Sequence, residues 1–142
     1  MDKVVLISCG ARKLDHAAPA RDLYTGSLFK AARRAAETIA KEWGIISARH
    51  GLVLPDQMVR PYEQRLDSYT LAELGAWAII TRDAIRSHWP GRSFIVLAPA
   101  LYCSCVEGLP AEFPLRGLGI GLQLHVLRQM ANAGSWPQQV AR

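Results

Sequence analysis

Reactive and charged side chains follow two short apolar runs of this chain. Ser8-Cys9-Gly10-Ala11-Arg12-Lys13 comes directly after Val4-Val5-Leu6-Ile7. Ser47-Ala48-Arg49-His50-Gly51 follows Ile45-Ile46 in the same way. A buried strand that ends in polar residues is typical of ligand sites, which lie at the carboxyl ends of the strands in an α/β sheet. The sequence therefore predicts that both segments belong to one site.

Four residues in or near these segments are candidates for catalysis. His50 can act as a general base or as a cation at an anion site, or it can simply hold the turn in place. Glu63 is either an acid–base group beside Lys13 or His50, or a salt-bridge partner. Cys9 has Arg12 and Lys13 close by in sequence, and such cations favour a nucleophilic thiolate. A small buried side chain is the commoner role of a free cysteine.

Cations and aromatic rings near the same segments are candidates for ligand binding. Arg12 with Lys13 after a strand can hold a phosphate, and Arg49 can add a two-pronged contact. Tyr24 and Tyr62 can stack on a nucleobase, although a half-buried core ring is the commoner role for each.

Small residues complete the predicted pocket. Ser8 opens the turn after the first apolar run, and Ser47 is expected to position a ligand rather than to attack it, because no His/Asp pair supports a nucleophilic serine. Gly117 and Gly119 precede the last predicted helix, where backbone amides can bind an anion or allow close packing of the helix on the sheet. We expect these turns and Pro61-Tyr62-Glu63 to form a four-part pocket.

Length and charge restrict the class of protein. The 142 residues fit one domain, which we expect to span 1–134 and to be followed by a C-terminal tail over 135–142. The formal net charge is +5. Residues 1–66 carry eleven Lys/Arg against seven Asp/Glu, and residues 67–142 carry six against five. The more basic half contains the predicted site, which favours an anionic partner, although a solvated basic surface explains the same charge.

Several protein classes lack support in the sequence. No apolar run approaches the roughly 20 residues of a membrane-spanning helix, and the N-terminus does not resemble a signal peptide. Three cysteines fit a reducing compartment, so we expect a cytoplasmic protein with no membrane partner. The chain has neither a CxxC pair nor an HExxH motif, and we expect no metal site and no cofactor.

Alternating apolar runs and amphipathic segments predict an α/β fold. We expect a single small domain with a mostly parallel sheet of about four strands and helices on both faces. The predicted strands cover 4–7, 45–48, 93–98 and 113–115, and the predicted helices cover 28–41, a segment starting at 70 and ending before Pro90, 100–107 and 119–133. The intervening segments 14–24 and 52–63 are expected to be loops.

The order of the motifs resembles a known family. Ile7-Ser8-Cys9-Gly10-Ala11-Arg12-Lys13-Leu14-Asp15 resembles the opening "ISPAKTLD" of the YaaA peroxide-stress proteins. A closer resemblance is to small bacterial and phage proteins related to YaaA, which share a Ser-Cys near the start and an Ala-x-x-Leu-Tyr that matches Ala20 to Tyr24. Their Ser-Ala-x-His-Gly-Leu, Pro-Tyr and Pro-Leu-x-Gly-Leu-Gly-Ile-Gly motifs match 47–52, 61–62 and 114–121.

The resemblance implies an α/β fold and a link to DNA. YaaA proteins are associated with DNA binding and with protection from oxidative damage, and some relatives act on modified bases as DNA glycosylases do. The sequence departs from the family pattern at Arg116, where the family usually has an acidic residue, and it has no helix-hairpin-helix element.

Two functions therefore remain open at this point. The first is a small DNA glycosylase or nucleobase–sugar bond hydrolase that acts on a modified base in DNA or a nucleotide. The alternative is a non-catalytic DNA- or nucleotide-binding protein with a stress or phage accessory role.

Overall fold

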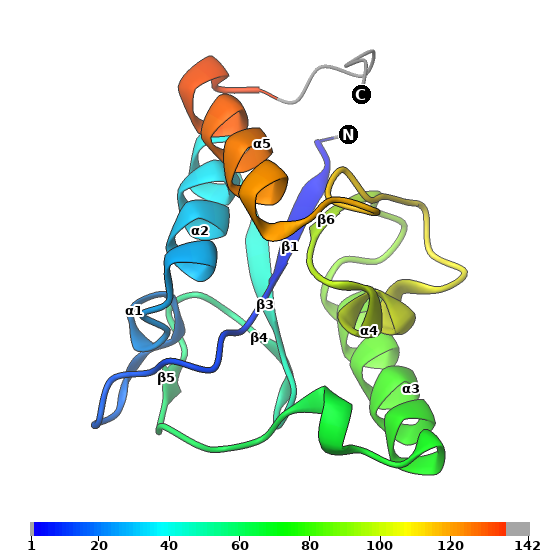
Figure 1. Ribbon diagram of the computed structural model, residues 1–142. Coiled ribbons are helices and arrows are strands. Elements are labelled where there is room, and N and C mark those ends of the chain that lie inside the picture. Colours follow the sequence, from blue (N-terminus) through cyan, green and yellow to red (C-terminus); the bar gives the residue numbers. More distant parts are fainter. Residues whose placement is uncertain (1, 136–142) are drawn as a thin grey trace.

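A five-stranded, mostly parallel β-sheet forms the centre of the protein (Figure 1). The computed structural model describes residues 2–135, so the predicted tail lies outside the described residues apart from Ser135. The strand order is β4-β3-β1-β6-β7, and only β4 runs antiparallel to its neighbour. The strands are β1 (Val4–Ser8), β3 (Trp43–Ser47), β4 (Gly51–Val53), β6 (Phe94–Leu97) and β7 (Ala111–Glu112).

Helices cover both faces of this sheet, which confirms the predicted fold class. On one face α2 (Ser27–Ile39) lies beside α5 (Ile120–Ala133) (Figure 1). The other face is covered by α3 (Leu71–His88), α4 (Ala100–Cys103) and the 3-10 turn η2 (Ser104–Val106). The helices α2 and α3 were predicted within a few residues of these bounds.

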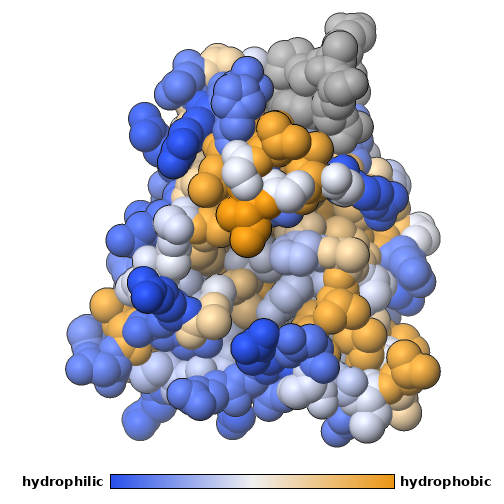
Figure 2. Space-filling view, in the orientation of Figure 1, coloured by the Kyte–Doolittle hydropathy of each residue, from blue (hydrophilic) through white to orange (hydrophobic). Residues whose placement is uncertain are grey.

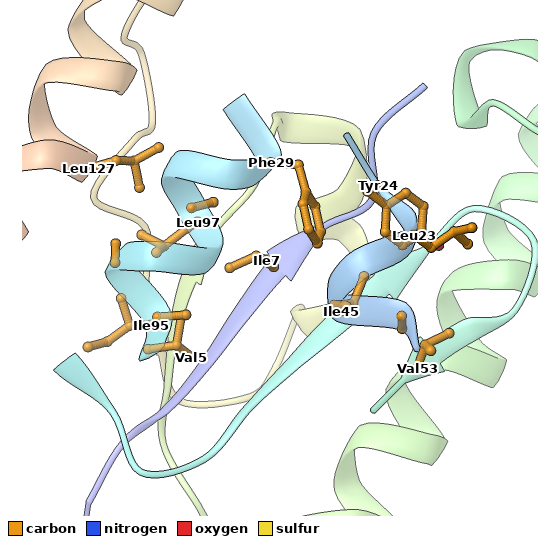
Figure 3. Packing of buried hydrophobic residues seen from close by; sticks show 14 of the residues in the cluster. Val5, Ile7, Leu23, Tyr24, Phe29, Ile45, Val53, Ile95, Leu97 and Leu127 are labelled. Carbon is orange, nitrogen blue, oxygen red and sulfur yellow. The ribbon is translucent and has the colours of Figure 1, made fainter. Parts of the chain in front are cut away.

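Alternation along the strands divides the core into two layers. Val5 and Ile7 of β1 point toward α2 and α5, together with Ile45, Ile95 and Leu97 (Figure 3). Val4 and Leu6 of the same strand pack on the α3 side. Because β1 is buried on both faces, its sequence is a continuous apolar run rather than an alternating one.

Local sequence signals fix the start of α3 and the turn into β4. Thr70 and Glu73 form a capping box at the start of α3, with Thr70 Oγ1 accepting from the Glu73 amide and Glu73 Oε1 accepting from the Thr70 amide. Gly51, which begins β4, has a φ of +74°, and a Cβ at this residue would lie 3.0 Å from Thr81 Oγ1. The tight turn from β3 into β4 therefore requires glycine.

Both segments predicted as loops contain regular structure. The strand β2 (Ala18–Pro19) pairs antiparallel with β5 (Met58–Val59), and the short helix α1 (Ala20–Leu23) follows β2. Residues 66–68 form the 3-10 turn η1 (Leu66–Ser68). Strands of two residues carry no periodic sequence signal, so pattern analysis does not detect them.

The predicted fourth strand at 113–115 is wrong. The last strand of the sheet, β7, lies earlier, at Ala111–Glu112. Pro114 has no amide hydrogen to donate to a neighbouring strand, and Leu115 is buried in the core beside α2 and α5 instead.

Candidate active site

The chain leaves the sheet in opposite directions after its two central strands. After β1 it continues to the face covered by α2, whereas after β6 it enters α4 on the opposite face. The resulting crevice at the carboxyl ends of neighbouring strands is the usual ligand position in an open α/β sheet. Cys9 follows β1 at this crevice, and its Sγ lies 3.3 Å from the hydroxyl of Tyr102 in α4.

A cavity of about 380 Å³ opens beside Cys9 on the α4 side, and we call it the cleft. Its walls are the three segments Cys9–Ala11, 64–67 and 99–102. The volume lies in the range of about 300 to 1,000 Å³ that small-molecule sites occupy. Exposed apolar residues gather nearby over α4 and the start of α5, including Leu101, Ile120 and Leu122 (Figure 2).

Three hydroxyl groups form a directed chain that runs from the end of β3 to Tyr24. Ser47, which is fully buried, accepts hydrogen bonds at Oγ from the amides of Arg49 (3.2 Å) and His50 (3.0 Å). These bonds use both lone pairs of the hydroxyl, so Ser47 donates its proton to the Tyr62 hydroxyl, 2.6 Å away. The Tyr62 hydroxyl lies 2.7 Å from that of Tyr24.

Burial changes the acidity of the tyrosines in this chain. It raises the pKa of Tyr24 to about 12, and the hydrogen bond from Tyr62 partly opposes this rise. Burial also raises the pKa of Tyr62, and the nearby Cys9 and Tyr24 add to the effect. The direction of these shifts fits Tyr62 as the donor and Tyr24 as the acceptor. Both phenols are therefore protonated at neutral pH.

Lys13 covers the outer side of the tyrosine pair. Its Nζ lies 4.4 Å from the ring centre of Tyr62 and 5.7 Å from that of Tyr24, within the range of cation–π contacts. Partial burial lowers the pKa of Lys13, while the electrostatic effects of Cys9 and Glu63 raise it. Cys9 and Glu63 therefore both lie within electrostatic range of Lys13.

A second hollow, of about 460 Å³, lies beside the cleft, and we call it the groove. Arg49, His50, Arg60, Tyr62 and Glu63 are among its lining residues. The His50 ring meets the Tyr62 ring edge-on, with centroids 5.2 Å apart. Partial burial, followed by the charge of Arg49, lowers the pKa of His50, so its imidazole is mostly neutral at pH 7. The charged side chains give the groove a positive balance, which suits an anion.

The predicted site residues thus line different cavities. Cys9 lines the cleft, whereas Arg49, His50, Tyr62 and Glu63 line the groove. Ser8 lines a small third cavity on the α2 side of Cys9, which is described below.

Three predicted binding residues lie elsewhere. Arg12 is exposed, and its carbonyl accepts from the Thr25 amide. Gly117 and Gly119 are also exposed, and Gly119 is the N-cap residue of α5. Within residues 2–135 none of the three lines the cleft, the groove or the third cavity. Three of the four expected parts of the pocket therefore lie near each other, and the turn with Gly117 and Gly119 is not among them.

Two residues of the cleft were missed by sequence analysis. Tyr102 follows β6, and the rule that sites lie at the carboxyl ends of strands could have selected it. Asp67 lies in the cleft with both carboxylate oxygens bound by Arg65, at 3.2 and 2.9 Å. In the sequence, Asp67 is marked only by an opposite charge two residues away in an irregular segment. This pattern is common on protein surfaces, so it does not identify a site.

Residues 2–135 contain neither a cluster of metal ligands nor a membrane-spanning helix. The structure contains no group of three His, Cys, Asp or Glu side chains that is arranged to hold a metal ion. Across the same residues, each helix is too short or too polar to cross a membrane.

Comparison with known proteins places the chain in a family. A family model described as "Family of unknown function (DUF6884)" matches residues 4–129. The chain belongs to this family. One relative of this DUF6884 protein is "Uncharacterized protein YfjM" of Bacillus subtilis (strain 168), which is 28% identical over 148 residues. The match covers 91% of this chain and 95% of the relative.

The residues matched by DUF6884 contain the whole candidate site. All lining residues of the cleft, the groove and the third cavity fall between positions 4 and 129. Neither match concerns YaaA, so the resemblance to that family stays a prediction.

Proposed function

We propose that this protein hydrolyses the bond between a modified nucleobase and its sugar, in a nucleotide or in DNA. The base would lie in the cleft and a phosphate in the neighbouring groove. The main support is the position of a mostly apolar cleft, which contains a thiol and a tyrosine hydroxyl, directly beside a cationic groove. Apolar walls with a few convergent polar groups suit a planar base, and arginines suit a phosphate.

Lys13 and Glu63 are the groups we assign to proton transfer. Lys13 Nζ lies 4.4 Å from the ring centre of Tyr62, a lining residue of the groove, and a lysine with a lowered pKa is a better acid near neutral pH. Lys13 would therefore reach past Tyr62 to donate a proton to the departing base. Glu63 would accept a proton from water as the water oxygen bonds to the sugar carbon. The base then leaves with the proton from Lys13, and the sugar keeps the new hydroxyl. Glu63 would also stabilise the positive charge that develops on the sugar.

Of the two roles that the sequence left open for Tyr24, the buried core ring fits its packing. The Tyr24 ring is only 2% exposed and packs on Phe29, so its face is not available to stack on a base. We assign Tyr24 and Tyr62 to hydrogen bonding, in which the chain from Ser47 holds both rings and supports Lys13. His50 would contact the phosphate as a neutral donor.

Release of the free base is the direct test of this proposal. Purified protein is incubated with modified nucleosides, nucleotides and single- and double-stranded oligonucleotides, and the free base is measured by liquid chromatography and mass spectrometry. Lys13→Ala and Glu63→Gln should each lower the rate at least about 100-fold, as expected for loss of an acid or a base. Lys30→Ala, on the exposed side of α2, is the matched control and should leave the rate unchanged.

The same experiment separates the two functions that the sequence left open. Binding of a nucleotide or of DNA without base release would contradict hydrolysis and favour a non-catalytic stress or phage accessory protein. Base release that survives both Lys13→Ala and Glu63→Gln would contradict the assigned site. A duplex substrate requires the base to be flipped out, whereas a free nucleotide does not. The free thiols of Cys9, Cys103 and Cys105 agree with the cytoplasmic location that we propose.

A further inference from the structure

A third cavity lies directly behind Cys9, on the side of the sheet that α2 and α5 cover. We call it the chamber, and its volume is about 100 Å³. Cys9, Gly10 and Pro99 line both the chamber and the cleft. The two cavities therefore share a wall at the crevice between β1 and β6.

The walls of the chamber are mainly apolar. Leu28, Phe29 and Ala32 of α2 form one side, and Leu115 and Leu127 form another. Phe29, Ala32, Leu115 and Leu127 belong to the buried core, so these walls are held by packing on both sides.

Three polar residues also line the chamber. The Gln123 amide nitrogen donates to the Leu118 carbonyl at 2.8 Å, and the Cys9 thiol contacts Tyr102. Ser8 contributes a hydroxyl at the end of β1. Two of the three polar residues thus have partners outside the chamber, which leaves its interior suited to an apolar group.

The volume restricts what the chamber can hold. An apolar cavity of about 150 Å³ in another protein stays dry and binds benzene. A chamber of about 100 Å³ is smaller than that and suits a substituent of a few carbon atoms. Interiors are otherwise packed with few voids larger than a water molecule, so an apolar space that opens at a candidate site indicates a ligand group.

We propose that the chamber binds a small alkyl substituent on the base, so that the preferred substrate is an alkylated nucleobase. This inference rests on the proposed function, because it takes the base to lie in the cleft. The substituent passes between Cys9, Gly10 and Pro99 and packs against α2. A charged substituent is excluded, because the chamber offers no opposite charge among its lining residues.

The test measures binding of two nucleoside series by calorimetry. One series is 2′-deoxyuridine with hydrogen, methyl, ethyl or propyl at C5, and the other is 2′-deoxyadenosine with the same groups on N6. Affinity should rise about fourfold for each buried carbon until the chamber is full, and then fall. Base release is measured on the same samples.

Two substitutions change the size of the chamber in opposite directions. A Cβ at Gly10 meets Phe29 Cβ at 3.8 Å, an ordinary contact, so Gly10→Ala should fold normally and favour a shorter alkyl group. Leu28→Ala enlarges the chamber and should favour a longer one. Gly75→Ala on α3, where a Cβ meets no atom within 4 Å, is the matched control and should leave the preference unchanged.

The outcomes distinguish the two proposals. Equal affinity along both alkyl series, or a preference that Gly10→Ala and Leu28→Ala leave unchanged, overturns the chamber proposal. Base release without an alkyl preference supports hydrolysis and overturns the chamber proposal alone. An alkyl preference that both substitutions shift, without base release, supports the chamber and contradicts hydrolysis.

Discussion

Replacement of Ser47 by alanine should be unusually destabilising for a serine. Its side chain is fully buried and makes three hydrogen bonds, two from the amides of Arg49 and His50 and one to the Tyr62 hydroxyl. Alanine removes all three and adds no steric conflict. The substitution thus isolates the contribution of one hydroxyl to the turn and to the tyrosine pair.

The expected magnitude follows from the number of bonds. A hydrogen bond inside a protein contributes about 0.5–1.5 kcal/mol net, so the loss of three lowers the free energy of unfolding by about 1.5–4.5 kcal/mol. Ser68 is the matched control, because it is exposed and its hydroxyl makes one bond, to the Arg65 carbonyl. Ser68→Ala should change the free energy of unfolding by about 0.5 kcal/mol or less.

Urea unfolding followed by circular dichroism measures both values. A double-mutant cycle of Ser47→Ala with Tyr62→Phe then tests the bond between the two hydroxyls, and we expect a coupling of about 0.5–1.5 kcal/mol. The reasoning is refuted if Ser47→Ala costs no more than Ser68→Ala. It is also refuted if the two substitutions in the cycle are additive.

Three further predictions concern the charge of the site and the packing of the sheet. Because burial lowers the pKa of Lys13, the protonated acid is lost as pH rises through a value below 10.5, so base release by the wild type should fall there. Lys13→Arg should release little base at any pH, because a guanidinium does not give up its proton, and wild-type activity in Lys13→Arg would contradict this role. If Arg49 and Arg60 contact two phosphates, the logarithm of single-strand DNA affinity should fall with that of salt concentration with a slope of about −1.4. Arg49→Gln with Arg60→Gln should remove most of this salt dependence, and a slope that the substitutions do not change rules out these contacts. A Cβ at Gly44 would lie 2.9 Å from Trp89 Cη2 and 3.1 Å from Leu52 Cδ1. Gly44→Ala should therefore lower the free energy of unfolding by about 1–3 kcal/mol, as measured by urea titration. An unchanged urea midpoint would contradict this close packing.

The sequence predicted the parts of the fold that carry long, regular signals. The apolar run within Val4–Ser8 identifies β1, because a strand that is buried on both faces is apolar throughout. The capping box at Thr70 and Glu73 identifies the start of α3, because both of its hydrogen bonds are local in sequence. The pairing of Ala18–Pro19 with Met58–Val59 depends on contacts between residues about forty positions apart. Such short strands are stabilised by pairing with their partner strands, and their own residues carry no pattern that predicts this pairing.

The candidate site was predictable to a similar extent. Cys9 and His50 follow strands, and the rule for carboxyl ends selects such positions. The contact between Cys9 and Tyr102 joins residues 93 positions apart and depends on how α4 leaves the sheet. Burial of the Tyr24 ring depends on Phe29 and the rest of the core, so the sequence left both a stacking role and a core role open, and only the core role fits the packed ring.

A crystal soaked with modified nucleosides and nucleoside monophosphates tests the central claim most directly. We expect electron density for the base in the cleft, between Cys9 and the segment 64–67, and density for the phosphate in the groove at Arg49 and Arg60. Density only in the separate hollow lined by Trp43 and Trp89 at the opposite end of β3, or no density with any compound of the panel, would contradict it.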